Sequence, residues 1–189
     1  DSESKSLQNY KESEVICHVL NQLKEQEVSE VYLLAGQNEE KVREALSESF
    51  DHLKINYVSE EDSNGNAAAL TNLETEISEH FVVVNGHVLA DVDISEMFDM
   101  HRNNSSVATI ALTAVQDPSK YVAARLKGDK ILVFEEKPEK GGEPSKLINA
   151  GTYIFDPAMF DYLSSDSIET VFEKLAEEGE LSGYIYGGK

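Results

Sequence analysis

Polar, charged and small residues gather in four segments that adjoin the ends of apolar, strand-like runs. These segments are Gly65-Asn66, Asn85-Gly86-His87, Glu135-Glu136-Lys137 and Asn149-Ala150-Gly151. A lysine ammonium group binds phosphate as a compact charge, and an asparagine amide both donates and accepts hydrogen bonds. Small residues let backbone N–H groups approach a ligand closely. Ligands of open α/β sheets bind outside the carboxyl ends of the strands, so these segments are the candidate binding site.

The spacing of apolar residues predicts the helices and strands that position this site. Predicted helices are Glu14–Glu25, Glu39–Leu46, Asn66–Glu76, Ile94–Arg102 and a last helix that opens at Ser167 and closes at Gly179. Predicted strands are Val31–Ala35, Leu53–Tyr57, Phe81–Val84, Val107–Val115, Thr152–Phe155 and Leu181–Tyr186. Tyr121–Leu126 and Ile131–Phe134 flank a turn at Gly128, which predicts a hairpin. Asp93 and Glu96 form the pattern of a capping box, and Asp156-Pro157 is typical of a helix start.

Alternating helices and strands predict an α/β fold. We expect a Rossmann-like, mainly parallel, doubly wound sheet with a small antiparallel insertion. The length of 189 residues fits one domain, since a single core usually serves roughly 100–200 residues. No linker or repeat divides the sequence, so we expect a single domain over residues 1–189.

The composition excludes several classes of protein. Lys and Arg number 16 and Asp and Glu 36, which gives a formal net charge of −20 and argues against nucleic-acid binding. We interpret this acidity as a solvated surface, or as adaptation to a salt-tolerant host. Apolar runs such as Val107–Val115 are too short to span a bilayer, and the first residues do not resemble a secretory leader. Cys17 is the only cysteine, which excludes an internal disulfide and favours a reducing, cytoplasmic setting.

Several motifs in one order resemble those of the sugar-1-phosphate nucleotidyltransferases, also called NDP-sugar pyrophosphorylases. The motifs are Phe81–Asp93 (FVVVNGHVLADVD), Ala108–Leu112, Glu136-Lys137-Pro138 and Asn149–Phe155. The resemblance extends over nearly the whole chain, because Ile16–Leu20 is similar to the family's first long helix and Asp62–Leu70 to its nucleoside-contacting glycine turn. It implies an enzyme that joins a sugar 1-phosphate to a nucleoside triphosphate and releases pyrophosphate with Mg²⁺.

The resemblance also implies roles for the matched residues. Lys137 would hold the sugar phosphate, and Lys5 falls where the family has a lysine, so both are candidate catalytic residues. Glu136 and Asn149 would bind sugar hydroxyl groups. The remaining candidate substrate-binding residues are Gly65, Asn66, Asn85 and Gly151.

The sequence departs from the family pattern at the metal site. The family has Asn-Gly-Asp where this sequence has Asn85-Gly86-His87, and that aspartate is a magnesium ligand. Mg²⁺ prefers oxygen donors, whereas an imidazole suits Zn²⁺ or Mn²⁺ better. His87 is therefore a doubtful metal ligand, and we expect the magnesium site to be lost. Val122 and Asn66 also replace a smaller glycine and a threonine near the expected ligand.

The resemblance also leads us to expect that both ends of the family domain are missing. The family begins with a strand and a glycine-rich loop that wraps the triphosphate, and its second metal aspartate would lie beyond Lys189. We therefore expect a weak or inactive enzyme as the chain stands. Without the central first strand, we expect something else to lie between Val31–Ala35 and Phe81–Val84: a rearranged strand, a partner chain or further residues.

Two alternatives to an active enzyme stay open. A non-catalytic nucleotide-sugar-binding or regulatory subunit would tolerate His87, because it performs no chemistry. Asp91-Val92-Asp93 matches the Asp-x-Asp pair with which glycosyltransferases hold a metal, although Asp93 also fits a helix cap. The expected partners are a nucleoside triphosphate, a sugar 1-phosphate or an NDP-sugar, and a second copy or partner subunit.

Overall fold

The computed structural model describes residues 15–34, 39–46, 50, 53–58, 66–163 and 167–187. The chain divides into two compact units. The first comprises Asp1–Ser63 and Gly86–Leu89, and the second comprises Asn64–Asn85 and Ala90–Lys189. Each unit is described below by itself.

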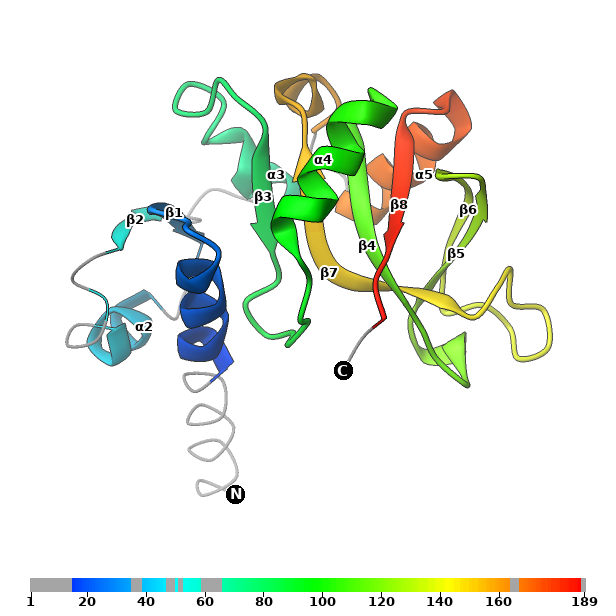
Figure 1. Ribbon diagram of the computed structural model, residues 1–189, viewed down its shortest axis with the longest axis horizontal. Coiled ribbons are helices and arrows are strands. Elements are labelled where there is room, and N and C mark those ends of the chain that lie inside the picture. The colour runs from blue at the N-terminus through cyan, green and yellow to red at the C-terminus, as the bar shows by residue number, and fades with distance from the viewer. Residues whose placement is uncertain are drawn as a thin grey trace. The chain divides into compact units, whose positions relative to one another are not determined.

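The first unit is a small α/β layer. A helix over residues 15–25 is followed by β1 (Glu30–Leu34), α2 (Glu39–Leu46) and β2 (Lys54–Val58) (Figure 1). The strands pair in parallel, with Val31 opposite Ile55. Leu20, Leu46, Phe50 and Leu53 form the buried core, and the helical spacing of the apolar residues predicted the first two.

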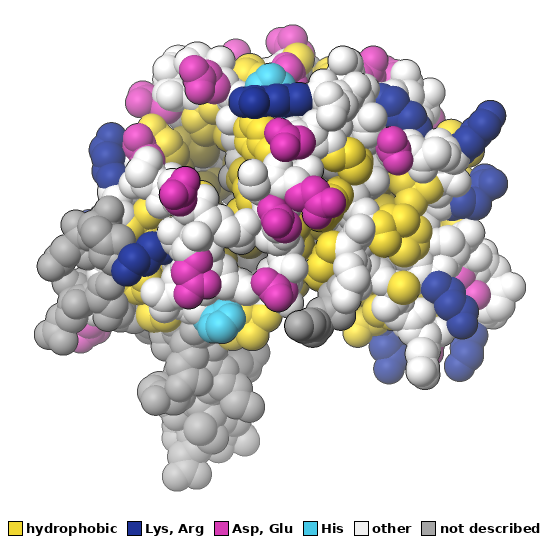
Figure 2. All heavy atoms as spheres, viewed as in Figure 1, with side chains coloured by type: hydrophobic (Ala, Val, Ile, Leu, Met, Phe, Trp, Pro, Cys, Tyr) yellow, Lys and Arg dark blue, Asp and Glu magenta, His cyan; other side chains and the backbone are white. Residues whose placement is uncertain are grey.

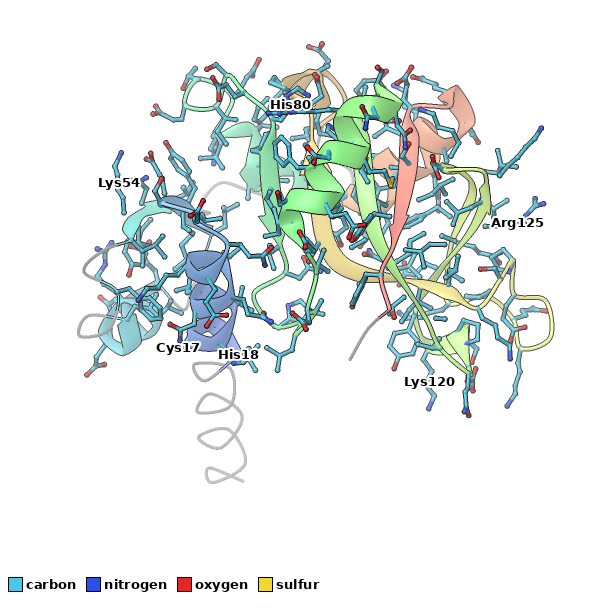
Figure 3. All side chains as sticks on the ribbon, viewed as in Figure 1. Cys17, His18, Lys54, His80, Lys120 and Arg125 are labelled. Atoms are coloured by element: carbon cyan, nitrogen blue, oxygen red, sulfur yellow. The ribbon has the colours of Figure 1, made fainter. Side chains whose placement is uncertain are left out.

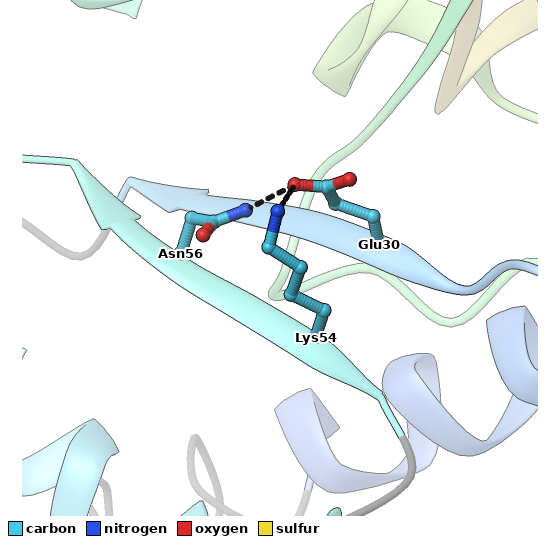
Figure 4. Close-up of polar contacts among 3 residues, drawn as sticks. All are labelled: Glu30, Lys54 and Asn56. Atoms are coloured by element: carbon cyan, nitrogen blue, oxygen red, sulfur yellow. Dashed lines mark hydrogen bonds and ion pairs between the residues drawn. The ribbon is translucent and has the colours of Figure 1, made fainter.

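Polar side chains fix the start of the β1–β2 pair (Figure 4). Lys54 lies opposite Glu30 in the register and donates to its Oε1 over 2.6 Å, and Asn56 Nδ2 donates to the same oxygen over 2.7 Å. These bonds, led by the one from Lys54, lower the pKa of Glu30. The pair is exposed, so it contributes little to stability.

The second unit contains a six-stranded sheet with helices on both faces (Figure 1). Its helices are α3 (Asn66–Thr71), α4 (Ile94–Asn104) and α5 (Ile168–Glu178), with 3₁₀ turns η2 (Pro118–Lys120) and η3 (Pro157–Asp161). Its strands are β3 (Phe81–Val84), β4 (Ala108–Ala114), β5 (Val122–Lys127), β6 (Lys130–Glu136), β7 (Leu147–Phe155) and β8 (Leu181–Ile185).

The strand β7 organises this sheet. The strand order is β3-β7-β4-β8-β6-β5, and β5 also pairs with β7, so the last five strands close into a ring. One edge of β7 pairs with β4 along its length. The other edge is shared, because β3 pairs with Thr152–Phe155 and β5 pairs with Leu147 and Ile148. Asn149–Gly151 therefore lies where β3 and β5 diverge from β7.

The α/β class is confirmed, but the prediction of a mainly parallel sheet is wrong for the described strands. Only β1–β2 and β4–β8 pair in parallel, and the other five pairs are antiparallel. Parallel neighbours need long crossovers, usually through a helix. No helix separates β6 from β7, and β5–β6 is the predicted hairpin around Gly128, so these strands reverse direction.

Three local predictions differ from the structure. The helix from Asn66 ends at Thr71, because residues 72–76 continue as turns with bonds such as Leu73 N to Leu70 O. Asp156 caps a 3₁₀ turn instead of an α-helix. Asp93 does cap α4 by accepting from Glu96 N over 2.9 Å, but the Glu96 carboxylate accepts the hydroxyl of Tyr184 over 2.6 Å.

The two faces of the sheet bury different sets of side chains. On the α4 side, Met97 packs with Ala111, Ala150 and Ile154. On the α5 side, Phe172 contacts the rings of Phe134, Tyr153 and Phe155, with centroid separations of 5.2 to 6.0 Å. Alternate residues of β7 therefore point to opposite layers.

The predicted filling between residues 31–35 and 81–84 stays a prediction. β1 pairs with β2, and β3 pairs with β7, so the described strands show no direct pairing of β1 with β3. Ala35 itself lies outside the described residues.

Candidate functional site

A bulge in β7 shapes the centre of the candidate site. Ile110 of β4 pairs with Tyr153 and Leu112 pairs with Asn149, so Ala111 alone faces three β7 residues. Gly151 lies in this bulge with φ +75°, a conformation that favours glycine. A Cβ atom at this position would lie 3.1 Å from Asn85 Nδ2. The bulge thus requires glycine both for its backbone and for its close approach to Asn85.

Asn85, Asn149 and Gly151, three of the predicted residues, form one hydrogen-bonded network. Asn85 N donates to Gly151 O over 2.8 Å, and Gly151 N donates to Asn149 Oδ1 over 2.8 Å. Asn149 Nδ2 donates to Tyr153 Oη over 2.9 Å, and Asn85 Nδ2 approaches the same oxygen at 3.4 Å. Both asparagine side chains are half-buried, so they retain access to a ligand.

Tyr153 is a member of this network that the sequence did not identify. Its side chain is 3% exposed, and its ring stacks on Phe155 with a centroid separation of 5.8 Å. Burial raises the pKa of the Tyr153 hydroxyl, although bonds from Asn149 and Asn85 oppose this. The sequence signal is weak, because a tyrosine in an apolar strand is usually a packing residue.

Glu136 and Lys137 form a second, exposed cluster at the end of β6. Their side chains pair at 2.9 Å, and Lys137 N donates to Tyr121 O over 2.8 Å. Lys137 has φ +47°, which turns the chain sharply after the strand. The bond to Glu136 raises the pKa of Lys137. Lys137 is exposed and ion-paired with Glu136, and its role in holding a phosphate stays a prediction.

The strand register places these two clusters near each other. Ala123 of β5 pairs with Glu135 on one side and with Ile148 on the other. Glu136, the next residue of β6, pairs with Val122. Asn149 directly follows Ile148, where the described pairing of β7 with β5 ends. The strand β5 therefore lies between the paired part of β7 and the end of β6. That Glu136 and Asn149 contact one ligand stays a prediction.

The other predicted residues are not brought into this arrangement by the described structure. Lys5 and Gly65 lie outside the described residues, and Asn66 opens α3 with its side chain also outside them. His87 is exposed and belongs to the first unit, next to Gly86. Its predicted place beside the ligand therefore stays a prediction.

The expected loss of the magnesium site stays a prediction, because Mg²⁺ is commonly held by one or two carboxylates together with substrate phosphates. Within residues 15–34, 39–46, 50, 53–58, 66–163 and 167–187, no three His, Cys, Asp or Glu side chains are placed to hold a metal ion. Asp93 Oδ1 is engaged as the cap of α4, and Asp91 is exposed. The Asp-x-Asp alternative stays a prediction.

A separate cleft lies at the start of β3 and β4, whereas Asn85 of the candidate site follows the end of β3. Figure 3 shows His80 there, before the first residue of β3. The cleft has a volume of about 330 Å³ and is lined by His80, His101, Arg102, Ser105, Ser106, Val107 and Asp156. None of the predicted site residues contributes to it. His101 is 1% exposed and bonds Thr109 Oγ1 through Nδ1 over 2.8 Å, which supports a structural role for this residue.

Comparison with known proteins decides the family. The sequence profile of the nucleotidyl transferase family matches residues 2–188. The chain belongs to the nucleotidyl transferase family. The predicted resemblance to sugar-1-phosphate nucleotidyltransferases is confirmed, since its relatives include the mannose-1-phosphate guanylyltransferase catalytic subunit beta of Xenopus tropicalis. That relative is 32% identical over 187 residues, which cover 94% of this chain and 51% of the relative.

Further nucleotidyl transferase relatives agree. The bifunctional protein GlmU of Methanococcus maripaludis is 30% identical over 183 residues, which cover 92% of this chain and 42% of that protein. The chain thus spans about half the length of the curated relatives that it matches. A protein from Bacillus anthracis assigned as a glucose-1-phosphate thymidylyltransferase has the same fold, with a TM-score of 0.80 and 22% identity over 93% of this chain and 75% of that one.

Proposed function

We propose that the chain is a sugar-1-phosphate nucleotidyltransferase domain that binds a hexose 1-phosphate. In the reaction, a phosphate oxygen of the sugar 1-phosphate forms a bond to the α-phosphorus of a nucleoside triphosphate. The bond from that phosphorus to the bridging oxygen breaks, and pyrophosphate leaves. The observation that supports this most is the Asn85–Asn149–Gly151 network on the far side of β5 from Glu136 and Lys137, in a chain of this family.

The chemistry of the two clusters suits the two ends of such a ligand. Phosphoryl transfer depends mainly on positioning and on neutralisation of negative charge. Lys137 would hold the phosphate, and Glu136 would accept hydrogen bonds from sugar hydroxyl groups. Asn149 and Asn85 would bind further hydroxyl groups, and the small Gly151 lets the ligand approach the strand.

A non-catalytic nucleotide-sugar-binding or regulatory subunit is the second candidate. The observation that favours it is His87 in the position for which the family resemblance implies a metal-binding aspartate. Such a protein would bind a sugar 1-phosphate or an NDP-sugar beside an active partner subunit or a second copy. Turnover by the chain alone would then be weak or absent.

The setting of the protein is also a proposal. No helix of the described residues is long and apolar enough to cross a bilayer. The lone Cys17 is free, which supports a reducing cytoplasm. Mg²⁺ is the expected cofactor of the family reaction, and added divalent metal is therefore a variable of the test below.

The test measures binding and turnover in the same protein. The chain is titrated calorimetrically with mannose 1-phosphate and then assayed for GDP-mannose with GTP and Mg²⁺ or Mn²⁺. We expect Lys137→Gln to weaken mannose 1-phosphate binding at least about tenfold, because a charge-assisted phosphate contact is lost. Lys140→Gln is the matched control, since Lys140 is also exposed and pairs with Asp117 at 3.9 Å.

The outcomes separate the two candidates. Binding with GDP-mannose formation supports the enzyme, whereas binding without turnover supports the non-catalytic subunit. Equal affinities of wild type and Lys137→Gln for mannose 1-phosphate would show that Lys137 does not contact the ligand. Failure to bind any hexose 1-phosphate or NDP-sugar would refute both.

A further inference from the structure

One buried hydroxyl group contacts the side chains of both asparagines in the candidate site. Tyr153 Oη accepts a hydrogen bond from Asn149 Nδ2 over 2.9 Å and one from Asn85 Nδ2 over 3.4 Å. We infer that Tyr153 is a positioning residue, whose hydroxyl holds the two amides in the orientation that presents them to the hydroxyl groups of a hexose 1-phosphate. This inference rests on the proposed function and adds a residue to it.

The bonds around Asn149 determine how its amide is oriented. Gly151 N is a donor, so the Asn149 atom that it contacts is the acceptor Oδ1. The other atom of the amide, Nδ2, therefore faces Tyr153. The tyrosine oxygen then acts as the acceptor. An amide oxygen accepts two hydrogen bonds and its nitrogen donates two, so Asn149 keeps one acceptor position and one N–H free of these two bonds. A sugar hydroxyl can both donate and accept, and it matches this pair.

The β7 bulge makes the contact between Asn149 and Tyr153 possible. In a regular strand, residues four apart have Cα atoms about 13 Å apart. Here the bulge at Gly151 shortens the separation between Asn149 and Tyr153. They pair with Leu112 and Ile110, which are only two residues apart. The tyrosine and the asparagine therefore reach each other along one face of the sheet.

The Tyr153 ring is held firmly by the core. It lies 5.8 Å from the Phe155 ring and 5.2 Å from the Phe172 ring of α5. Its side chain is 3% exposed, so the hydroxyl has little freedom to move. The position of the half-buried asparagines is thus tied to the packing beneath the sheet, which is how a binding group is preorganised.

The experiment compares two tyrosine-to-phenylalanine variants of the full chain. Tyr153→Phe removes the hydroxyl in question. Tyr184→Phe removes a similar buried hydroxyl, 8% exposed, which bonds Glu96 on the α4 side of the sheet. Calorimetry measures mannose 1-phosphate and, separately, GTP. We expect Tyr153→Phe to weaken mannose 1-phosphate binding about tenfold with GTP unchanged, and Tyr184→Phe to leave both within twofold.

A second measurement needs no variant and no ligand. Side-chain amide hydrogens of Asn149 in the wild type should exchange with water more slowly than those of Asn103, which is exposed. Equal exchange rates would overturn the inference even if Tyr153→Phe does not fold. Wild-type affinity in Tyr153→Phe, or equal losses in both variants, would overturn it while the proposed function stands. If the wild type binds no hexose 1-phosphate, both the proposed function and the inference are refuted.

Discussion

His101 shows how one buried side chain sets the pH dependence of stability. Burial, followed by the nearby His80, lowers the pKa of His101 from 6.5 to about 4. When the pH falls below 6.5, His101 is protonated in the unfolded chain, but in the folded chain it stays neutral until about pH 4. Stability from this residue is therefore complete above pH 6.5 and is lost as the pH falls towards 4, by about 3 kcal/mol.

The prediction is tested by unfolding in urea between pH 7 and pH 4. His101→Gln should lose about 3 kcal/mol less stability over this range than the wild type, because it has no group that titrates there. His18→Gln is the control, since His18 is exposed on the helix of residues 15–25, where Figure 3 labels it. The same pH dependence in all three proteins would contradict the account of His101.

The bulge of β7 is the element on which the candidate site depends. We expect Gly151→Ala to destabilise the fold by about 2–3 kcal/mol, because φ +75° strains alanine and its Cβ would lie 3.1 Å from Asn85 Nδ2. Gly128→Ala is the matched control. Gly128 has φ +61° but no atom within 4 Å of the added Cβ, so only the backbone strain applies.

Chemical denaturation of the two glycine variants measures this difference. Gly151→Ala should lose more stability than Gly128→Ala, and it should also weaken mannose 1-phosphate binding, since Asn85 and Asn149 both bond Gly151. Equal stability losses, with binding intact, would show that the bulge does not organise the asparagines.

Sequence reasoning succeeded where local chemistry determines an element. Asp93 and Ser167 cap their helices, Gly179 ends α5 in the left-handed region, and Gly128 turns the hairpin, all as predicted. It failed at Asn149, because the strand was predicted to begin at Thr152, whereas β7 spans Leu147–Phe155. The partners of that segment, β3, β4 and β5, are remote in sequence, and the bulge breaks the alternation that marks a strand.

The sheet order and Tyr153 could not be predicted for a similar reason. Parallel or antiparallel pairing depends on which strands meet in space, and a helix between two strands does not decide it. Tyr153 could not be predicted because its hydroxyl contacts Asn85, which follows β3, and Asn149, which lies on the other side of the β7 bulge. By contrast, residue types and the family resemblance named Asn85, Glu136, Lys137 and Asn149, whose binding roles stay predictions.

Across the whole molecule, charge is distributed unevenly. The chain carries −20, yet Lys120, Arg125, Lys127, Lys130, Lys137, Lys140 and Lys146 lie on or beside the β5–β6 hairpin. Figure 2 shows acidic side chains over α4 and Lys and Arg gathered around that hairpin, where Figure 3 labels Lys120 and Arg125. A phosphate would therefore be attracted to this part of an otherwise repulsive surface.

The most direct test maps where a hexose 1-phosphate binds on the ¹⁵N-labelled chain by NMR. We expect mannose 1-phosphate to shift the backbone amides of Glu136, Lys137 and residues 149–151 together, along with the side-chain amide of Asn149. The cleft at Ser105–Val107 should stay unchanged. Shifts confined to that cleft, or no shifts at saturating ligand, would contradict the placement of the sugar-phosphate site on β6 and β7.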